Sequence, residues 1–252
     1  WVRFVLANYF YNQNRQDSDL TILDKIDKFP PYEILKKIAN DELKKNPFNV
    51  RKYWIDVQKE ICKNFDKFVF LKNHNALVKI EENELTNKFL SKAAIYIVRD
   101  PRDVLVSYLK FDKTLDKKKA LERLINKNLF CHVSKNNHLD IEFLGSWKFN
   151  YISWRDGIKD IPRIIVRYED LLKDPFFSFK KIIVFLKKIL NQELDNDRLN
   201  FSINQSVFTR LQNLEKKFGF AESKNKFFNT GQSNNWHDVL SNEDITIIEN
   251  AF

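Results

Sequence analysis

The sequence has few of the Cys and His residues that commonly build metal sites and disulfides, and it has no long apolar run. It contains no Met, four Gly, two Cys and four His in 252 residues. Cys62 and Cys131 lie too far apart to match a metal-binding spacing, and in a chain of this length we expect two reduced thiols. No pair of histidines has the spacing of a zinc-binding helix, and no apolar run approaches the roughly 18–20 residues that cross a bilayer. The sequence therefore predicts neither a metal site nor a membrane span.

A helix start is also lacking at the first residues. The stretch "WVRFVLANYFYN" places apolar and aromatic residues at helical spacing, but no capping residue precedes them. Together with the absence of Met, this indicates a sequence that begins inside a helix. We therefore expect further residues before Trp1 in the native protein.

The composition is that of a globular protein with an excess of positive charge. Hydrophobic residues are 43% and charged residues 31% of the chain, which is long enough for one substantial domain. The formal net charge of +9 favours anionic partners, although a general bias toward Lys explains it equally well. Basic residues do not form a stripe with interleaved aromatics, so we do not expect a nucleic-acid partner.

Short apolar runs alternate along the chain with segments of helical periodicity. Residues 67–71, 93–98 and 163–167 have strand character. Helical character is found in residues 2–11, 30–45, 51–65, 100–111, 117–130, 142–157, 178–190 and 206–219, and from about residue 241. This alternation predicts an α/β protein with a mainly parallel central sheet flanked by helices.

Polar residues follow the three predicted strands. Lys72 and His74 follow the first, Arg99 the second, and the run 167–170 the third. Ligands of parallel α/β sheets bind beyond the carboxyl ends of the strands. Arg99 also precedes a helix N-terminus, where free N–H groups favour an anion, and Ser107 two turns later offers a hydroxyl. The alternative is a surface cluster in which Arg99 and Arg102 pair with Asp100 and Asp103.

The stretch "YIVRDPRDVLVSY" resembles the 3′-phosphate-binding segment of the sulfotransferase superfamily, whose donor is 3′-phosphoadenosine 5′-phosphosulfate. Four further segments resemble those of the family, in the family's order: "WVRFVLANYFYN", "LKNHNAL", "GSWKFNYISW" and "IVRYEDLLKDP". "LKNHNAL" looks more like bacterial-type members than animal cytosolic ones. The resemblance implies a P-loop-like three-layer fold, one domain over residues 1–252, a cytoplasmic enzyme and no metal.

The resemblance also implies two catalytic roles. His74 would be the general base that takes the proton of the acceptor hydroxyl, a task suited to a neutral imidazole. Lys72 would stabilise charge on the transferring sulfuryl group or on the bridging oxygen.

Donor binding is implied for residues from other parts of the chain. Arg99 and Ser107 would hold the 3′-phosphate, and Trp1 and Tyr168 would contact adenine. Core packing is the alternative for both aromatic residues. We expect Glu169 and Asp170 to cap the following turn rather than to touch the ligand.

The sequence departs from the family pattern in two places. The donor loop would precede Trp1, and we expect the native protein to have it. Where the family usually has Arg-Lys-Gly against the 3′-phosphate, this chain has Asn229, Thr230 and Gly231. Each charge-assisted hydrogen bond lost weakens donor binding by about 1.5–3 kcal/mol. The alternative is that Lys224 or Lys226 replaces the missing positive charges. Retention of Gly231 predicts a backbone conformation that favours glycine.

Two other functions stay open at this point. One is a nucleotide-binding relative without activity, and the other is a P-loop kinase. Within the sulfotransferase interpretation the acceptor is a hydroxyl or amine of a small molecule or glycan, and the sequence does not predict the oligomeric state.

Overall fold

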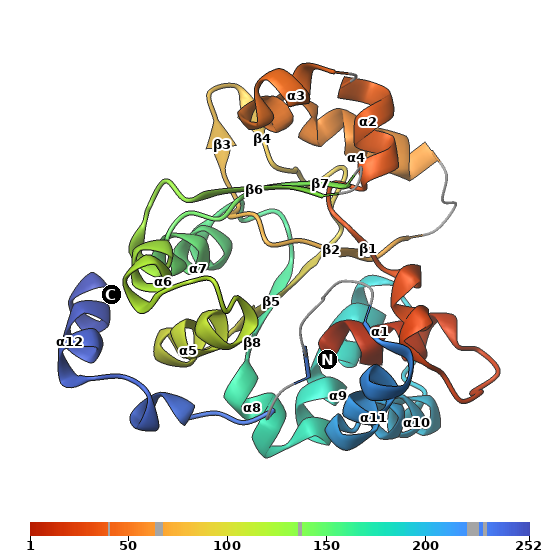
Figure 1. Ribbon diagram of the computed structural model, residues 1–252. Helices are drawn as coiled ribbons and strands as arrows, with labels where there is room; N and C mark the ends of the chain where they lie inside the picture. Colours follow the sequence, from red (N-terminus) through yellow and green to blue (C-terminus); the bar gives the residue numbers. More distant parts are fainter. Residues whose placement is uncertain (40, 64–67, 136–137, 221–226, 229–230) are drawn as a thin grey trace. The chain divides into compact units, whose positions relative to one another are not determined.

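The computed structural model describes the chain except residues 40, 64–67, 136–137, 221–226 and 229–230, and except the side chains of residues 132–140. It forms two compact units, each built from separate stretches of sequence (Figure 1). The first unit contains residues 1–26, 95–120 and 164–249, and the second unit contains residues 27–94, 121–163 and 250–252. The single domain expected from the sequence stays a prediction.

The first unit is helical. Its elements are α1 (Val2–Tyr11), η1 (Leu20–Lys25), α5 (Pro101–Phe111), α8 (Tyr168–Lys173), α9 (Pro175–Ile189), α10 (Asn196–Gln205), α11 (Phe208–Phe218), η3 (Asn235–Asp238) and most of α12 (Asn242–Ala251). Helix α1 packs against α10, and α10 packs against α9 (Figure 1). One core cluster of this unit joins buried Phe4 of α1 to Leu211 of α11 and to Phe228.

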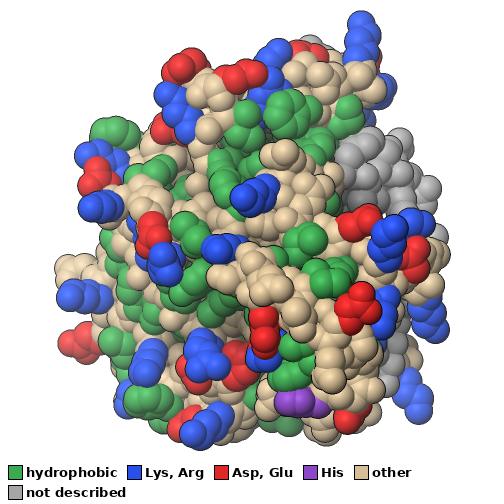
Figure 2. Space-filling view, turned by 90° about the vertical axis from the view of Figure 1, so that its left-hand side faces the viewer, with side chains coloured by type: hydrophobic (Ala, Val, Ile, Leu, Met, Phe, Trp, Pro, Cys, Tyr) green, Lys and Arg blue, Asp and Glu red, His purple; other side chains and the backbone are tan. Residues whose placement is uncertain are grey.

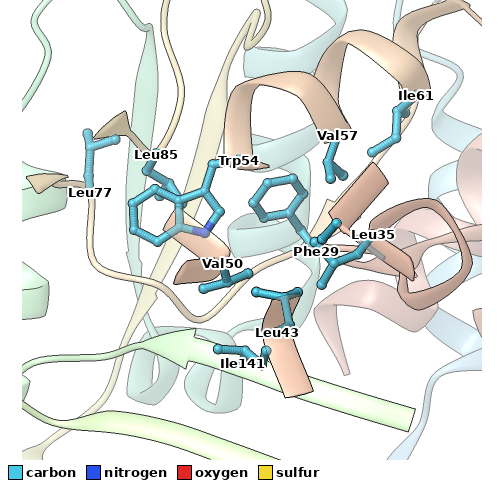
Figure 3. Packing of buried hydrophobic residues seen from close by; sticks show 11 residues of the cluster. Phe29, Leu35, Leu43, Val50, Trp54, Val57, Ile61, Leu77, Leu85 and Ile141 are labelled. Atoms are coloured by element: carbon cyan, nitrogen blue, oxygen red, sulfur yellow. The ribbon is translucent and has the colours of Figure 1, made fainter. Parts of the chain in front are cut away.

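The second unit combines helices with short strands. Its elements are β1 (Asp27–Lys28), α2 (Tyr32–Ala39), α3 (Glu42–Lys45), η2 (Pro47–Tyr53), α4 (Trp54–Lys63), β2 (Leu71–Lys72), β3 (Lys79–Ile80), β4 (Asn83–Glu84), β6 (Phe130–Lys135), β7 (His138–Phe143) and α7 (Trp147–Asp156). Trp54, Val57 and Ile61 lie at helical spacing on α4 and point into one apolar cluster (Figure 3). Ile141 of β7 reaches the same cluster.

Three further elements have residues in both units: β5 (Ala94–Val98), α6 (Lys117–Ile125) and β8 (Arg163–Arg167). In the described part of the chain, β5 pairs with β8, β1 with β2, β3 with β4 and β6 with β7, each as a two-stranded sheet. The β1–β2 pair is parallel, whereas β3–β4 and β6–β7 are antiparallel.

The fold prediction is therefore confirmed only in part. The structure is mostly helical with small sheets, and its described residues form no clear central sheet. The first predicted strand, 67–71, appears as the two-residue β2, and the segment between α6 and α7 forms an antiparallel hairpin that the periodicity did not predict. Strands of two residues offer too few ladder hydrogen bonds to extend a sheet.

Several local predictions are confirmed. Helix α5 begins at Pro101, and its N-cap residue Asp100 accepts a hydrogen bond from the N–H of Arg102. Strands β5 and β8 and helices α1 and α11 lie where the periodicity places them. Cys62 and Cys131 are free thiols. In the part of the chain that is described, no helix has the length and apolar character needed to span a bilayer.

Candidate functional site

His74 lies just after β2 in a segment without regular secondary structure, and neighbouring elements of the second unit hold the backbone there. The side-chain amide of Asn150, on α7, donates to the carbonyl of His74 at 3.1 Å. The indole N–H of Trp154 donates to the carbonyl of Asn75 at 2.9 Å. The side-chain oxygen of Asn75 accepts from the N–H of Phe143, on β7, at 2.7 Å. These bonds hold the backbone from which the imidazole projects.

The imidazole of His74 contacts a carboxylate that the motifs do not predict. Nδ1 lies 3.0 Å from Oε1 and 3.2 Å from Oε2 of Glu142. The side chain of His74 is 46% exposed, whereas that of Glu142 is only 9% exposed. The imidazole is therefore partly exposed to solvent while its Nδ1 faces a buried acid.

The positive charges of two lysines, Lys28 and Lys72, lower the pKa of the same carboxylate. Lys28 and Lys72 are register partners in the parallel β1–β2 pair, and the N–H of Phe29 donates to the carbonyl of Lys72 at 2.8 Å. Lys28 Nζ lies 3.8 Å from Glu142 Oε2. Burial alone raises the pKa of Glu142, but the hydrogen bond with His74 and the charges of His74, Lys28 and Lys72 outweigh it, so the pKa lies below its ordinary value.

The structure thus places the predicted base, His74, against an acid whose pKa the charge of Lys72 also lowers. Sequence reasoning missed both Glu142 and Lys28, because Glu142 is 68 residues away from its partner along the chain. The available signal was the alternation in "HLDIEF", where an acid follows an apolar residue just before the "GSW" motif.

Arg99 lies directly after β5, in the first unit. Its Nη2 donates to the carbonyl of Gln232 at 3.0 Å, and its guanidinium carbon lies 4.6 Å from the centroid of the Tyr168 ring. The ring of Tyr168 is edge-on to Trp1, with centroids 6.4 Å apart, and Trp1 is also edge-on to Phe179 at 5.4 Å. Three predicted donor-binding residues, Trp1, Arg99 and Tyr168, are therefore brought together.

The pKa of the Tyr168 phenol is raised. Burial is the main cause, and the positive charge of Arg99 opposes it without cancelling it. The phenol is therefore neutral at pH 7 and is available as a hydrogen-bond donor.

Arg102 forms the ion pair that the alternative of a surface charge cluster predicts. Arg102 Nη2 lies 2.7 Å from Asp100 Oδ2, and its guanidinium carbon lies 3.9 Å from the ring centroid of Trp236. Asp103 is buried and accepts a hydrogen bond from the N–H of Asn234 at 2.7 Å. Arg99 donates to the backbone carbonyl of Gln232 and also lies over the ring of Tyr168, so its contacts differ from those of Arg102.

Glu169 does not act as the predicted cap. Its Oε1 accepts a hydrogen bond from the N–H of Asp100 at 3.0 Å, so it ties the start of α8 to the turn that follows β5. Helix α8 begins after Arg167 without a side-chain cap. The carboxylate is used for this longer-range contact because the N–H of Asp100 precedes α5 and has no partner within that helix.

Of the remaining predicted donor-site residues, the structure describes Ser107 and Gly231. Ser107 is an exposed residue on α5. Gly231 has φ of +58°, which confirms the predicted backbone conformation, and a Cβ there would lie 2.8 Å from the ring of Phe208. Asn229 and Thr230, like residues 224 and 226, lie outside the described residues.

On the face shown in Figure 2, Lys and Arg side chains are interspersed with acidic and apolar ones rather than gathered in one band.

Among the side chains that the structure describes, no three His, Cys, Asp or Glu residues are placed to hold a metal ion. The chemistry that the described cluster offers is proton transfer at His74 beside the positive charge of Lys72.

Comparison with known proteins finds a family whose model matches most of the chain. Residues 34–252 match the family described as "Sulfotransferase domain". Sulfotransferase 2A1 of Rattus norvegicus is 35% identical over 159 residues, which are 55% of this chain and 52% of that protein. Amine sulfotransferase of Oryctolagus cuniculus is 27% identical over 150 residues, 59% of this chain and 40% of that protein. The chain therefore spans about half the length, or less, of these curated relatives.

The fold of this chain is also similar to that of solved structures. A mouse sulfotransferase complexed with PAP has a TM-score of 0.56 and 20% identity, over 76% of this chain and 67% of that one. Retinol dehydratase in complex with androsterone and PAP has a TM-score of 0.61 and 15% identity, over 99% of this chain and 74% of that one. At these identities the likeness shows the fold. The two curated relatives and the mouse enzyme are animal proteins, so the bacterial-type resemblance of "LKNHNAL" stays a prediction.

Proposed function

Because this chain belongs to the sulfotransferase domain family, we propose that the protein transfers a sulfuryl group from 3′-phosphoadenosine 5′-phosphosulfate to a hydroxyl or amine of an acceptor. The observation that carries the proposal is the cluster in the second unit. His74, the predicted base, has its Nδ1 against Glu142 at 3.0 Å, and Lys72 acts on the same carboxylate. A base oriented by an acid beside a positive charge suits group transfer to a hydroxyl.

The catalytic roles are assigned to the two residues of the "LKNHNAL" segment. Nε2 of His74 accepts the proton of the acceptor hydroxyl as the new oxygen–sulfur bond forms. The bond from sulfur to the 5′-phosphate oxygen breaks, and 3′-phosphoadenosine 5′-phosphate leaves. Lys72 stabilises the negative charge that develops on the sulfuryl or bridging oxygens. Positioning and charge supply most of the rate, as in phosphoryl transfer.

The donor roles are assigned to residues of the first unit. The guanidinium of Arg99 pairs with the 3′-phosphate, with the hydroxyl of Ser107 as a second contact. Trp1 and Tyr168, whose ring centroids are 6.4 Å apart, contact adenine. Gly231 itself has a left-handed backbone conformation. Asn229 and Thr230 are assigned as neutral hydrogen-bonding groups toward the 3′-phosphate.

The acceptor is assigned only by its chemical class. A small molecule or glycan with a hydroxyl or amine suits a base that is partly exposed. The names of the relatives support this range, since one is an amine sulfotransferase and another is the luciferin sulfotransferase of Photinus pyralis. We expect no nucleic-acid acceptor.

Donor binding tests the proposal first. The full-length protein is titrated calorimetrically with 3′-phosphoadenosine 5′-phosphate and, separately, with adenosine 5′-phosphate. We expect the first to bind at least about 10-fold more tightly, because one charge-assisted hydrogen bond to the 3′-phosphate is worth about 1.5–3 kcal/mol. Equal and weak binding of the two nucleotides would contradict the donor assignment.

Transfer is tested with the sulfur-labelled donor and a panel of phenols, aliphatic alcohols, amines and glycans. A sulfated product supports the proposal. Tight nucleotide binding without transfer to any acceptor would favour a relative without activity. Transfer of phosphate from ATP in place of sulfate would favour a P-loop kinase.

A further inference from the structure

Glu142 belongs to no sequence motif, yet its side chain is buried against the proposed base. It follows Ile141, which is fully buried in the apolar cluster of the second unit (Figure 3). Successive residues of a strand point to opposite faces, so the carboxylate of Glu142 points away from that cluster. A carboxylate that is 9% exposed is costly unless it is hydrogen-bonded and its charge is balanced. His74 and the two lysines satisfy both conditions.

The hydrogen bond between the two side chains has a defined direction. The pKa of Glu142 lies below its ordinary value, because the bond with His74 and the nearby positive charges outweigh the effect of burial. An ionised carboxylate accepts hydrogen bonds and cannot donate them. Nδ1 of His74 must therefore carry the proton, and in the neutral ring Nε2 then carries the lone pair.

The backbone of His74 supports this orientation. Its carbonyl accepts from Asn150, and the next residue is held by Trp154. With the backbone fixed, rotation about the side-chain bonds is the main freedom left to the ring. The two distances from Nδ1 to the Glu142 oxygens, 3.0 and 3.2 Å, place Nδ1 within hydrogen-bonding distance of both acceptor atoms.

We propose that Glu142 is a positioning residue: it holds His74 in the tautomer whose unprotonated Nε2 receives the acceptor's proton. The role rests on the proposed sulfuryl transfer. When Nε2 takes the proton the ring becomes a cation, and the carboxylate beside Nδ1 stabilises it. Lys28, 3.8 Å from the second carboxylate oxygen, keeps the acid ionised and in place.

The tautomer of His74 tests the role without an acceptor. Long-range proton–nitrogen NMR spectra of the full-length protein, labelled with ¹⁵N-histidine, are recorded at pH 7.5, and His74→Asn identifies the signals. We expect the Nδ1–H tautomer in the wild type. In Glu142→Gln we expect a mixture, because the carboxamide both donates and accepts and so selects neither tautomer. An Nε2–H or doubly protonated ring in the wild type, or an unchanged tautomer in the variant, would overturn the proposal.

Kinetics then separate positioning from a merely structural effect. With an acceptor found in the transfer panel, we expect Glu142→Gln to lower kcat about 10- to 100-fold, below the full 10²–10⁴-fold contribution of a general base. The KM for donor and the Kd for 3′-phosphoadenosine 5′-phosphate stay unchanged. The matched control is Glu60→Gln, which removes an α4 carboxylate paired with Lys37 and Lys63 at 3.2 and 2.9 Å, and it leaves kcat unchanged.

Two outcomes of these experiments have different meanings. A wild-type kcat in Glu142→Gln would overturn the positioning role while leaving the sulfotransferase proposal intact. If no acceptor in the panel is sulfated, that result counts against the proposed function, and the tautomer measurement still decides what Glu142 does to the ring.

Discussion

The guanidinium carbon of Arg99 lies 4.6 Å from the centroid of the Tyr168 ring, and this contact joins the residue after β5 to the first residue of α8. A cation over an aromatic face is stabilised by the ring quadrupole. Nη2 of the same guanidinium donates to the carbonyl of Gln232 at 3.0 Å. Arg99 is therefore oriented before any ligand binds, so less conformational freedom is lost on binding.

Arg99→Ala is expected to weaken binding of 3′-phosphoadenosine 5′-phosphate by about 10- to 100-fold, from the loss of a charge-assisted bond of about 1.5–3 kcal/mol. Calorimetric titration measures the change. Arg15→Ala is the matched control, because Arg15 forms an exposed ion pair with Asp195 in the same unit. Similar affinities for wild type and Arg99→Ala would remove Arg99 from the donor site.

Lys72→Met is expected to lower kcat by about 10²-fold or more, since it removes a positive group placed where charge develops. Lys79→Met provides the control, because Lys79 is an exposed residue of β3 that pairs with Glu82. Steady-state assays with an acceptor from the panel measure both variants. A kcat that falls equally in the two variants would indicate a general effect of charge rather than a specific role.

Gly231→Ala is expected to lower the free energy of unfolding by about 1–3 kcal/mol, the cost of an unfavourable backbone conformation. The reason is the φ of +58° together with a Cβ position 2.8 Å from the Phe208 ring. Urea denaturation measures the loss. In a Phe208→Leu background the loss should be smaller, since part of the clash is relieved, and an equal loss in both backgrounds would contradict this explanation.

The stability of the protein should depend on the ionisation of Glu142. Its pKa in the folded protein is lowered, so its contribution is complete above the unfolded value of about 4.3 and disappears as the pH falls through the folded value. Urea denaturation of the wild type and Glu142→Gln between pH 7 and pH 3 measures this. The difference in unfolding free energy between the two should become less favourable to the wild type as the pH falls, and the opposite trend would contradict the shift.

The parts of the structure that depend on local pattern were predictable from the sequence. Asp100 followed by Pro101 defines the start of α5, and the apolar run before Arg99 forms β5. Capping chemistry and periodicity act over a few residues and are therefore visible in the sequence. The left-handed conformation at Gly231 was predicted differently, from its match to the family pattern in a chain with only four glycines.

Contacts between distant segments were not predictable. The partner of His74 is 68 residues away, and the N–H of Asn234 that donates to Asp103 is 131 residues away. No local pattern in the sequence indicates such pairs. The predicted central sheet was not confirmed for a related reason. Strand β2 is only two residues long, and which strands pair depends on tertiary contacts rather than on each strand's own periodicity.

His74 tests the central claim most directly, namely that this imidazole removes the acceptor's proton. His74→Asn is compared with wild type for sulfate transfer to an acceptor from the panel and for the Kd of 3′-phosphoadenosine 5′-phosphate. We expect transfer to fall by about 10²- to 10⁴-fold while the Kd changes by less than about twofold. Transfer at the wild-type rate in this variant would contradict the assignment of His74 as the base.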